Sequence, residues 1–254
     1  MGVLPGAEPF AAEGGEVGVV LSHGFTGSTQ SLRPWAEHLA GAGLTVRLPR
    51  LPGHGTRWQD LNDTRWPDWY GEVERCFDDL RGRCRQVFGM GLSMGGTLVT
   101  RLAEQRPAEV AGLVLVNPSL GSERKDVKYA LPLLHRVVPS LAGIGSDIRK
   151  PGMTELAYGR TPLRAMHSLS RLWPLVVADL GRVTAPVLLY RSRVDHVVEP
   201  MSGRLLREGA SSTEVTEVML EDSYHVATLD NDAPTIFAGS LEFVRTHTSA
   251  PAAG

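Results

Sequence analysis

The stretch that decides the fold is Val87-Phe88-Gly89-Met90-Gly91-Leu92-Ser93-Met94-Gly95-Gly96-Thr97-Leu98-Val99. Its apolar first half predicts a buried strand, and the residues after Gly95 favour a helix that begins without an intervening loop. Glycines two residues either side of Ser93 would let strand and helix pass close together. By itself the pattern also fits a plain glycine-rich turn. With the right context, it predicts a sharp strand-turn-helix unit that presents Ser93 as a nucleophile.

Composition and charge predict an ordinary globular protein. The 254 residues are 42% apolar and 21% charged, with a formal net charge of −2 at pH 7, so the charge balance indicates no nucleic-acid partner. No apolar run approaches the roughly 18 residues of a spanning helix, and residues 1–8 lack signal-peptide features. Cys76 and Cys84 are expected in one helix, about 12 Å apart and beyond disulfide reach. We therefore expect a cytoplasmic protein with free thiols and no stable membrane insertion.

Strands and helices alternate along most of the chain. Apolar runs predict strands at residues 17–22, 44–48, 87–92, 110–116, 185–190 and 215–220. Amphipathic patterns predict helices near residues 32–41, 67–80, 94–106, 200–209 and 234–246. This order is typical of an α/β fold with a mostly parallel central sheet, right-handed crossovers and flanking helices.

The alternation breaks over residues 119–182. This block has no strand-like run but contains helical fragments, among them residues 129–138 and 161–172. About sixty residues are too many for a simple crossover. We therefore expect an α/β core formed by residues 1–118 and 183–254, with residues 119–182 inserted as a helical cap.

A serine nucleophile needs a base to take its proton and a carboxylate to orient that base. In chain order these follow Ser93 as acid and then histidine, on loops after late strands. Of the eight histidines, His225 lies just past the last strand and before the final helix, so it is the expected base. Asp195, after the penultimate strand, is the expected acid. Asp222 and Asp179 are weaker alternatives, because neither follows a suitable strand end outside the cap.

The oxyanion of an attacked carbonyl needs two converging N–H donors. The Met94 amide, directly after the serine, is one candidate, and the Phe25 amide in the glycine-bounded loop 23–27 is the other. No phosphate-binding glycine loop or C-x-x-C is present, and the histidines lack metal-ligand spacing. We therefore expect no cofactor and no metal.

Four motifs together resemble the α/β-hydrolase superfamily, in particular its small bacterial carboxylesterases and monoacylglycerol lipases. They are His-Gly-Phe-Thr-Gly (23–27), Leu-Pro-Gly-His-Gly (51–55), Gly-Leu-Ser-Met-Gly-Gly (91–96) and Tyr-His-Val-Ala-Thr-Leu-Asp (224–230). The similarity runs from about residue 17 to residue 247, and the cap stretches 144–151 and 155–162 look more like the monoacylglycerol lipases. The resemblance implies a triad and oxyanion hole formed by Ser93, Asp195, His225, Phe25 and Met94. It further implies cleavage of an ester of one medium or long acyl chain, through an acyl-serine intermediate.

A monoacylglycerol combines an apolar tail with two free hydroxyls, so its pocket needs an apolar tunnel and a few polar groups. Glu155 is expected to accept a hydrogen bond from glycerol, although a solvated helix charge is an equal alternative. The cap supplies the apolar side chains of Leu131, Leu133, Leu134, Val137, Val138, Leu141 and Ile144. This apolar surface would also allow transient contact with a lipid surface.

Other chemistries remain open on the same residues. A triad of this kind also serves general carboxylesterases, thioesterases and lactonases, which only the pocket separates. A haloalkane dehalogenase is disfavoured, because it would have an aspartate where Ser93 stands. A ligand-binding protein that keeps the fold without turnover is a remote alternative. The sequence leaves the oligomeric state undetermined.

Overall fold

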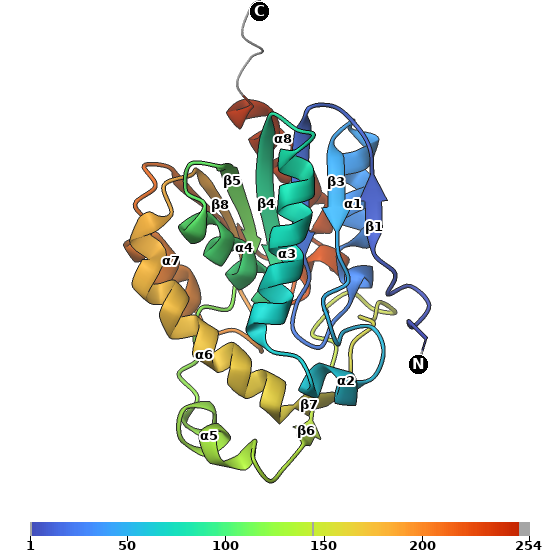
Figure 1. Ribbon diagram of the computed structural model, residues 1–254, viewed down its shortest axis with the longest axis vertical. Helices are drawn as coiled ribbons and strands as arrows, with labels where there is room; N and C mark the ends of the chain where they lie inside the picture. The colour runs from blue at the N-terminus through green and yellow to red at the C-terminus, as the bar shows by residue number, and fades with distance from the viewer. Residues whose placement is uncertain (1, 144, 249–254) are drawn as a thin grey trace, which may run out of the picture.

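The computed structural model describes residues 2–143 and 145–248, and its centre is a seven-stranded sheet (Figure 1). The strand order is β1-β3-β2-β4-β5-β8-β9, and every pairing is parallel except that of the edge strand β1 with β3. The strands are β1 (Phe10–Ala12), β2 (Val17–Ser22), β3 (Thr45–Leu48), β4 (Gln86–Leu92), β5 (Val110–Val116), β8 (Val187–Ser192) and β9 (Val215–Leu220). The mostly parallel sheet predicted from the sequence is therefore confirmed.

Helices cover both faces of the sheet. One face packs against α1 (Arg33–Gly41) and α8 (Ala233–His247), the other against α3 (Trp66–Arg81) and α4 (Met94–Gln105). Successive strand residues enter opposite cores: Val87 joins the α3/α4 side, whereas Phe88 joins the α1/α8 side. Strands buried on both faces read as continuous apolar runs, which explains why the central strands were visible in the sequence. The short α2 (Trp58–Asn62) and α7 (Met201–Gly209) complete the core helices.

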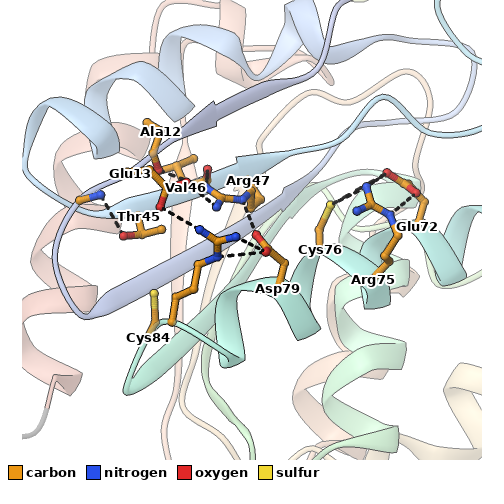
Figure 2. A network of polar contacts seen from close by, with 12 residues as sticks. Ala12, Glu13, Thr45, Val46, Arg47, Glu72, Arg75, Cys76, Asp79 and Cys84 are labelled. Carbon is orange, nitrogen blue, oxygen red and sulfur yellow. Dashed lines mark hydrogen bonds and ion pairs between the residues drawn. The ribbon is translucent and has the colours of Figure 1, made fainter.

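The edge strand β1 was not expected, because it spans only three residues of a loosely patterned N-terminal segment. Its attachment depends on Arg47 of β3 (Figure 2). The Arg47 guanidinium donates to the Ala12 carbonyl at 3.3 Å, to Glu13 at 2.6 Å and to Asp79 of α3 at 2.7 Å. One largely buried cation thus joins β1, β3 and α3 through contacts more than thirty positions apart.

The two cysteines differ from the expectation in one respect. Cys76 lies in α3, but α3 ends at Arg81, so Cys84 belongs to the turn before β4 rather than to the same helix. Gly82 is the C-cap residue, and the chain must then reverse to enter the sheet. Both thiols are free and buried, and burial raises the pKa of Cys76 to about 11. Neither thiol is therefore activated as a nucleophile.

Within residues 119–182, α5 (Leu131–Leu134), β6 (Ser140–Ala142) and β7 (Arg160–Pro162) lie beyond the carboxyl ends of the central strands, at the lower end of Figure 1, and α6 (Leu163–Asp179) runs from there up along the core. A single π-turn (Asp126–Ala130) precedes α5. The expectation of no strands here was wrong: β6 pairs antiparallel with β7. Three-residue strands are too short to produce a readable alternation.

The helices of this block also differ in length from their predicted ranges. The expected helix over residues 129–138 is reduced to the π-turn and α5, whereas α6 runs well past residue 172. Pro174 lies inside α6 with its side chain exposed, and the helix continues because Trp173 and Val176 are buried against the core. Within the described residues, no helix is long and apolar enough to cross a membrane.

Candidate active site

Ser93 occupies the sharp turn between β4 and α4. Its backbone has φ 55° and ψ −121°, a conformation that non-glycine residues rarely adopt. A Cβ on Gly95 would overlap the Ser22 carbonyl of β2, and a Cβ on Gly91 would overlap Gly95 itself. Two glycines are therefore required for helix and strands to approach this closely, and Ser93 bears the strain at the apex.

His225 and Asp195 are brought together by the loops after β9 and β8. His225 Nδ1 lies 2.8 Å from Asp195 Oδ2, and the two side chains are only 7% and 9% exposed. The other Asp195 oxygen accepts the Val197 and Val198 amides, each at 2.8 Å. The carboxylate is thus held on both sides, which directs the second imidazole nitrogen away from Asp195.

The pKa values of this pair reflect their mutual attraction. Burial opposes ionisation of Asp195, but the charge and hydrogen bond of His225, with the two amides, hold its pKa below the ordinary range. Burial likewise lowers the pKa of His225, but Asp195, with Glu155 and Asp147, raises it overall. The neutral imidazole needed for a general base therefore forms only above the ordinary histidine range.

Ser93 and His225 line the same pocket. The described residues include no hydrogen bond between the Ser93 hydroxyl and the His225 ring. Such contacts are often long in an empty site and shorten when substrate binds.

The loop after β2 places Gly24 and Phe25 beside the serine. A Cβ on Gly24 would lie 3.5 Å from Ser93 Cβ, so this loop runs in van der Waals contact with the serine. The buried His23 orients this loop: its Nδ1 bonds the Gly24 carbonyl at 3.0 Å, and its Nε2 accepts the Leu51 amide at 3.2 Å. Burial lowers the pKa of His23 to about 4, so the ring stays neutral.

The second candidate donor, the Met94 amide, belongs to the first turn of α4. First-turn amides have no acceptor within their own helix, and the helix dipole favours negative charge at this end. Together with the loop at Phe25, this arrangement can stabilise an oxyanion formed on a carbonyl attacked by Ser93.

The pocket above these residues has a volume of about 280 Å³ and mostly apolar walls. Leu141, predicted to contact substrate, lines it, as do Leu131, Leu134, Met166, Leu169 and Trp173. Leu133 and Val137 do not line it; their side chains are 67% and 79% exposed. Ile144, also predicted to contact substrate, lies outside the described residues.

Glu155 is one of the carboxylates that line the pocket, and it lies in a loop rather than on a helix. A Cβ on Gly27 would overlap the Glu155 carboxylate, so the glycine makes room for it. Burial raises the pKa of Glu155 to about 7, against the opposing effects of His225 and a hydrogen bond from Ser31. Near neutral pH this side chain can therefore either accept or donate a hydrogen bond.

Two residues that hold the histidine loop were not found from the sequence. Asp147 accepts the His225 amide at 3.1 Å and bonds His196 Nδ1 at 2.8 Å. Asn117, after β5, donates to the His225 carbonyl at 2.8 Å. Both contacts join segments that lie far apart in the chain. The only local signal in the sequence is that Asn117, a polar residue, directly follows the apolar run 110–116.

The described residues contain no group of three or more His, Cys, Asp or Glu side chains arranged to hold a metal ion. Their chemistry is that of an activated serine facing an apolar pocket. Such a site can attack a carbonyl carbon, stabilise the oxyanion and retain an acyl group on Ser93.

Comparison with known proteins identifies the family of this chain. The family model described as serine aminopeptidase, S33, matches residues 16–232. A thermostable monoacylglycerol lipase from Bacillus sp. (strain H-257) is 45% identical over 245 residues, covering 96% of this chain and 97% of the relative. A carboxylesterase from Bacillus subtilis (strain 168) is 26% identical over 239 residues, covering 93% and 96%.

Two solved structures extend the comparison. One, from work on the metagenome-derived lipolytic enzymes LipS and LipT, has a TM-score of 0.94 at 45% identity and covers 97% of this chain and 100% of the other. A monoacylglycerol lipase from Paleococcus ferrophilus has a TM-score of 0.81 at 24% identity, covering 94% and 98%. The second likeness concerns the fold alone.

Proposed function

Because the chain belongs to the serine aminopeptidase S33 family of the α/β-hydrolase superfamily, we propose that it is a carboxylic ester hydrolase acting preferentially on monoacylglycerols. The products are glycerol and a medium- or long-chain fatty acid. The observation that carries this proposal is the hydrogen bond between Asp195 and His225, since His225 lines the same apolar pocket as Ser93. The choice of monoacylglycerols is supported by the 45% identity to a monoacylglycerol lipase over nearly the full length of both chains.

The reaction follows from the positions of these groups. His225 takes the proton of Ser93 as the hydroxyl oxygen attacks the ester carbonyl, and the Phe25 and Met94 amides donate to the resulting oxyanion. Collapse of this intermediate breaks the bond to glycerol, whose oxygen receives the proton from His225. A water molecule, deprotonated by the same imidazole, then attacks the acyl-serine and releases the fatty acid. Asp195 stays ionised throughout and stabilises the charged imidazole.

The pocket suits such a substrate in both polarity and position. The acyl chain would lie against the apolar walls near Leu141, and Glu155 would bond a free hydroxyl of the glycerol. A general carboxylesterase would use the same triad without needing the Glu155 carboxylate. The similarity to the Bacillus subtilis carboxylesterase supports this alternative.

A rate comparison tests the proposal. We expect kcat/KM for a monoacylglycerol to exceed the values for the methyl and p-nitrophenyl esters of the same medium-chain acid. The Ser93→Ala variant should lose at least about 10³-fold on all three, since no other group can form the acyl intermediate. Faster turnover of the plain esters would make the protein a general carboxylesterase. Absence of hydrolysis by folded wild type would direct the search to thioesters and lactones.

A further inference from the structure

A second cavity lies outside the Ser93 pocket, between the start of α3, the end of α5 and the outer side of α6. It is an open groove of about 620 Å³, and no residue that lines it also lines the Ser93 pocket. Its charged and titratable lining residues are all basic: Arg65, His135, Arg136, Arg164, His167 and Arg171. The chain as a whole has a net charge of −2, so this local excess of positive charge is not a consequence of composition.

Helix α6 lies between the two cavities, and a different side of the helix lines each of them. Its side chains at 163, 166, 169 and 173 line the Ser93 pocket, whereas those at 164, 167, 168 and 171 line the groove. Both sets follow the spacing of three and four residues that defines one side of a helix. The polar side of α6 is therefore directed into a cavity with its own wall, formed by α3 and α5.

The cations of the groove have no acidic partners. Most arginines of this protein form an ion pair, but among the described residues no carboxylate lies within ion-pair distance of Arg136, Arg164 or Arg171. Arg65 donates to the Asn62 and Thr64 carbonyls, which carry no net charge. The carboxylate of Asp68 bonds the Arg65 main-chain amide rather than a guanidinium of the groove.

The two histidines are stacked at the centre of this cluster. The rings of His135 and His167 are nearly parallel, with an interplanar angle of 8° and centroids 3.9 Å apart. Burial lowers the pKa of His167, and His135, Arg171, Arg136 and Arg65 lower it further. Like charges held this close destabilise one another unless an anion lies among them.

We propose that this groove is a binding site for a phosphate-type oxyanion. Guanidinium groups bind phosphate oxygens in a bidentate manner, and a protonated imidazole adds a charge-assisted donor. A bound anion would offset the mutual repulsion of the cations, since none of the described carboxylates forms an ion pair with these guanidinium groups. Two sources supply this chemistry: a soluble phosphate or phosphate ester, and the phosphate of a lipid headgroup. The exposed Leu133 and Val137, which flank His135 and Arg136 on the same turn, would meet the acyl region in the second case.

The site is tested by NMR titration of the histidine ring protons at constant ionic strength, in sodium phosphate against sodium chloride. The signals are assigned with His135→Gln and His167→Gln. We expect phosphate to raise the pKa of His167 by about half a unit or more, to shift the ring-proton signals of His135 saturably, and to leave the signals of His38 unchanged. The double variant Arg136→Gln/Arg171→Gln should weaken phosphate binding at least about fivefold.

The matched control is Arg204→Gln/Arg245→Gln, which removes the same charge from exposed arginines on α7 and α8. Vesicles of phosphatidylglycerol, compared with phosphatidylcholine, distinguish the sources. Phosphate binding without vesicle binding assigns the groove to soluble phosphates. Phosphate binding together with phosphatidylglycerol binding that the groove variant alone abolishes assigns it to a lipid headgroup. No saturable phosphate effect, or equal losses in the control variant, would overturn the proposal.

Discussion

Glu155 lines the Ser93 pocket, and its charge, together with those of Asp195 and Asp147, raises the pKa of the His225 imidazole. If it bonds a glycerol hydroxyl, Glu155→Gln should lower kcat/KM for a monoacylglycerol by about 10-fold, because a neutral amide oxygen replaces the charged acceptor. The methyl ester of the same acid should change less than about twofold. Equal losses on both esters would remove Glu155 from the substrate site.

The same variant should change the pH dependence of the reaction. The acidic limb of kcat/KM reports protonation of His225, whose pKa is raised above its ordinary value. Activity of the wild type should therefore rise with pH through a midpoint above about 6.5. Without the Glu155 charge the imidazolium is less stable, so the midpoint of Glu155→Gln on the methyl ester should move to lower pH. Glu242→Gln, an exposed carboxylate on α8, is the charge-matched control.

Asp147 acts on the reaction through His225 rather than on the substrate. Its carboxylate accepts the His225 amide and also bonds the His196 ring and amide. Asp147→Ala should lower kcat by about 10- to 100-fold with little change in KM, because a small displacement of the base is enough to slow proton transfer. Asp147→Asn keeps an acceptor oxygen and should restore most of the rate. A kcat for Asp147→Ala within twofold of wild type would contradict this positioning role.

The sequence was most informative about residues that follow strand ends. Ser93, Asp195 and His225 could be chosen because each comes directly after an apolar run, and the required chain order removed most other histidines. Asp147 and Asn117 could not be chosen, because their contacts with His225 span 78 and 108 positions. Nothing local in the sequence marks a residue whose partner is brought close only by the fold.

At the scale of elements, Arg101 of α4 joins this helix to α6 and also bonds a buried carboxylate of its own helix. Glu104 of α4 is fully buried and lies 2.9 Å from Arg101, which also bonds Asp179 at the end of α6. One Glu104 oxygen has no hydrogen-bond partner among the described groups. Burial raises the pKa of Glu104 to about 8, against the opposing effect of the shared guanidinium.

This shift makes stability depend on pH. Between the ordinary value near 4.5 and the folded value of about 8, the folded state holds a proton that the unfolded state has lost. The free energy of unfolding should therefore fall as pH rises through this range. Glu104→Gln mimics the neutral acid, so it should reduce the fall between pH 5 and 8 by about 2–4 kcal/mol. Urea unfolding at both pH values measures it, with Glu242→Gln as control; parallel curves for wild type and Glu104→Gln would contradict it.

Elements differed in how far the sequence could predict them. The central strands give continuous apolar runs because both their faces are buried, and the long helices α3 and α8 give a helical periodicity because one side of each is buried. The short strands β1, β6 and β7 depend on particular partners, as Arg47 shows for β1. The continuation of α6 past Pro174 likewise depends on tertiary burial of Trp173 and Val176, which outweighs the local preference of proline.

On the scale of the whole molecule, the proposed catalytic groups and the walls of their pocket come from different parts of the chain. Ser93, Asp195 and His225 follow strands of the central sheet, whereas residues 119–143 and 145–182 supply Glu155 and most of the apolar walls. Helix α6 contacts the core through α4 and also faces the basic groove. An anion bound in the groove would therefore contact the outer side of a helix that forms part of the substrate pocket.

Asp230 bonds both residues 149–150 and the segment that carries His225. Its side chain is 1% exposed and accepts four main-chain amides: Arg149 at 2.7 Å, Lys150 at 2.9 Å, Tyr224 at 2.9 Å and Asn231 at 2.8 Å. The amides of Arg149 and Lys150 belong to the segment 145–182, and Tyr224 directly precedes His225. Asp230→Asn replaces an acceptor oxygen by a donor and leaves buried amides without a partner. We expect a loss of about 3 kcal/mol, which for a chain of this size lowers Tm by about 6–10 °C.

The same substitution should lower kcat, because the segment that carries His225 would no longer be joined through Asp230 to residues 149–150. Thermal unfolding and kinetics on one preparation separate the two effects, since kcat is measured well below the unfolding transition. Asp222→Asn is the matched control: this carboxylate is exposed and forms only a surface ion pair with Arg149. It should change Tm by less than about 2 °C. If Asp230→Asn lowered Tm and kcat no more than Asp222→Asn, the Asp230 hydrogen bonds would not be needed to hold residues 149–150 in place. The position of His225 would then depend on its hydrogen bonds with Asp147 and Asn117.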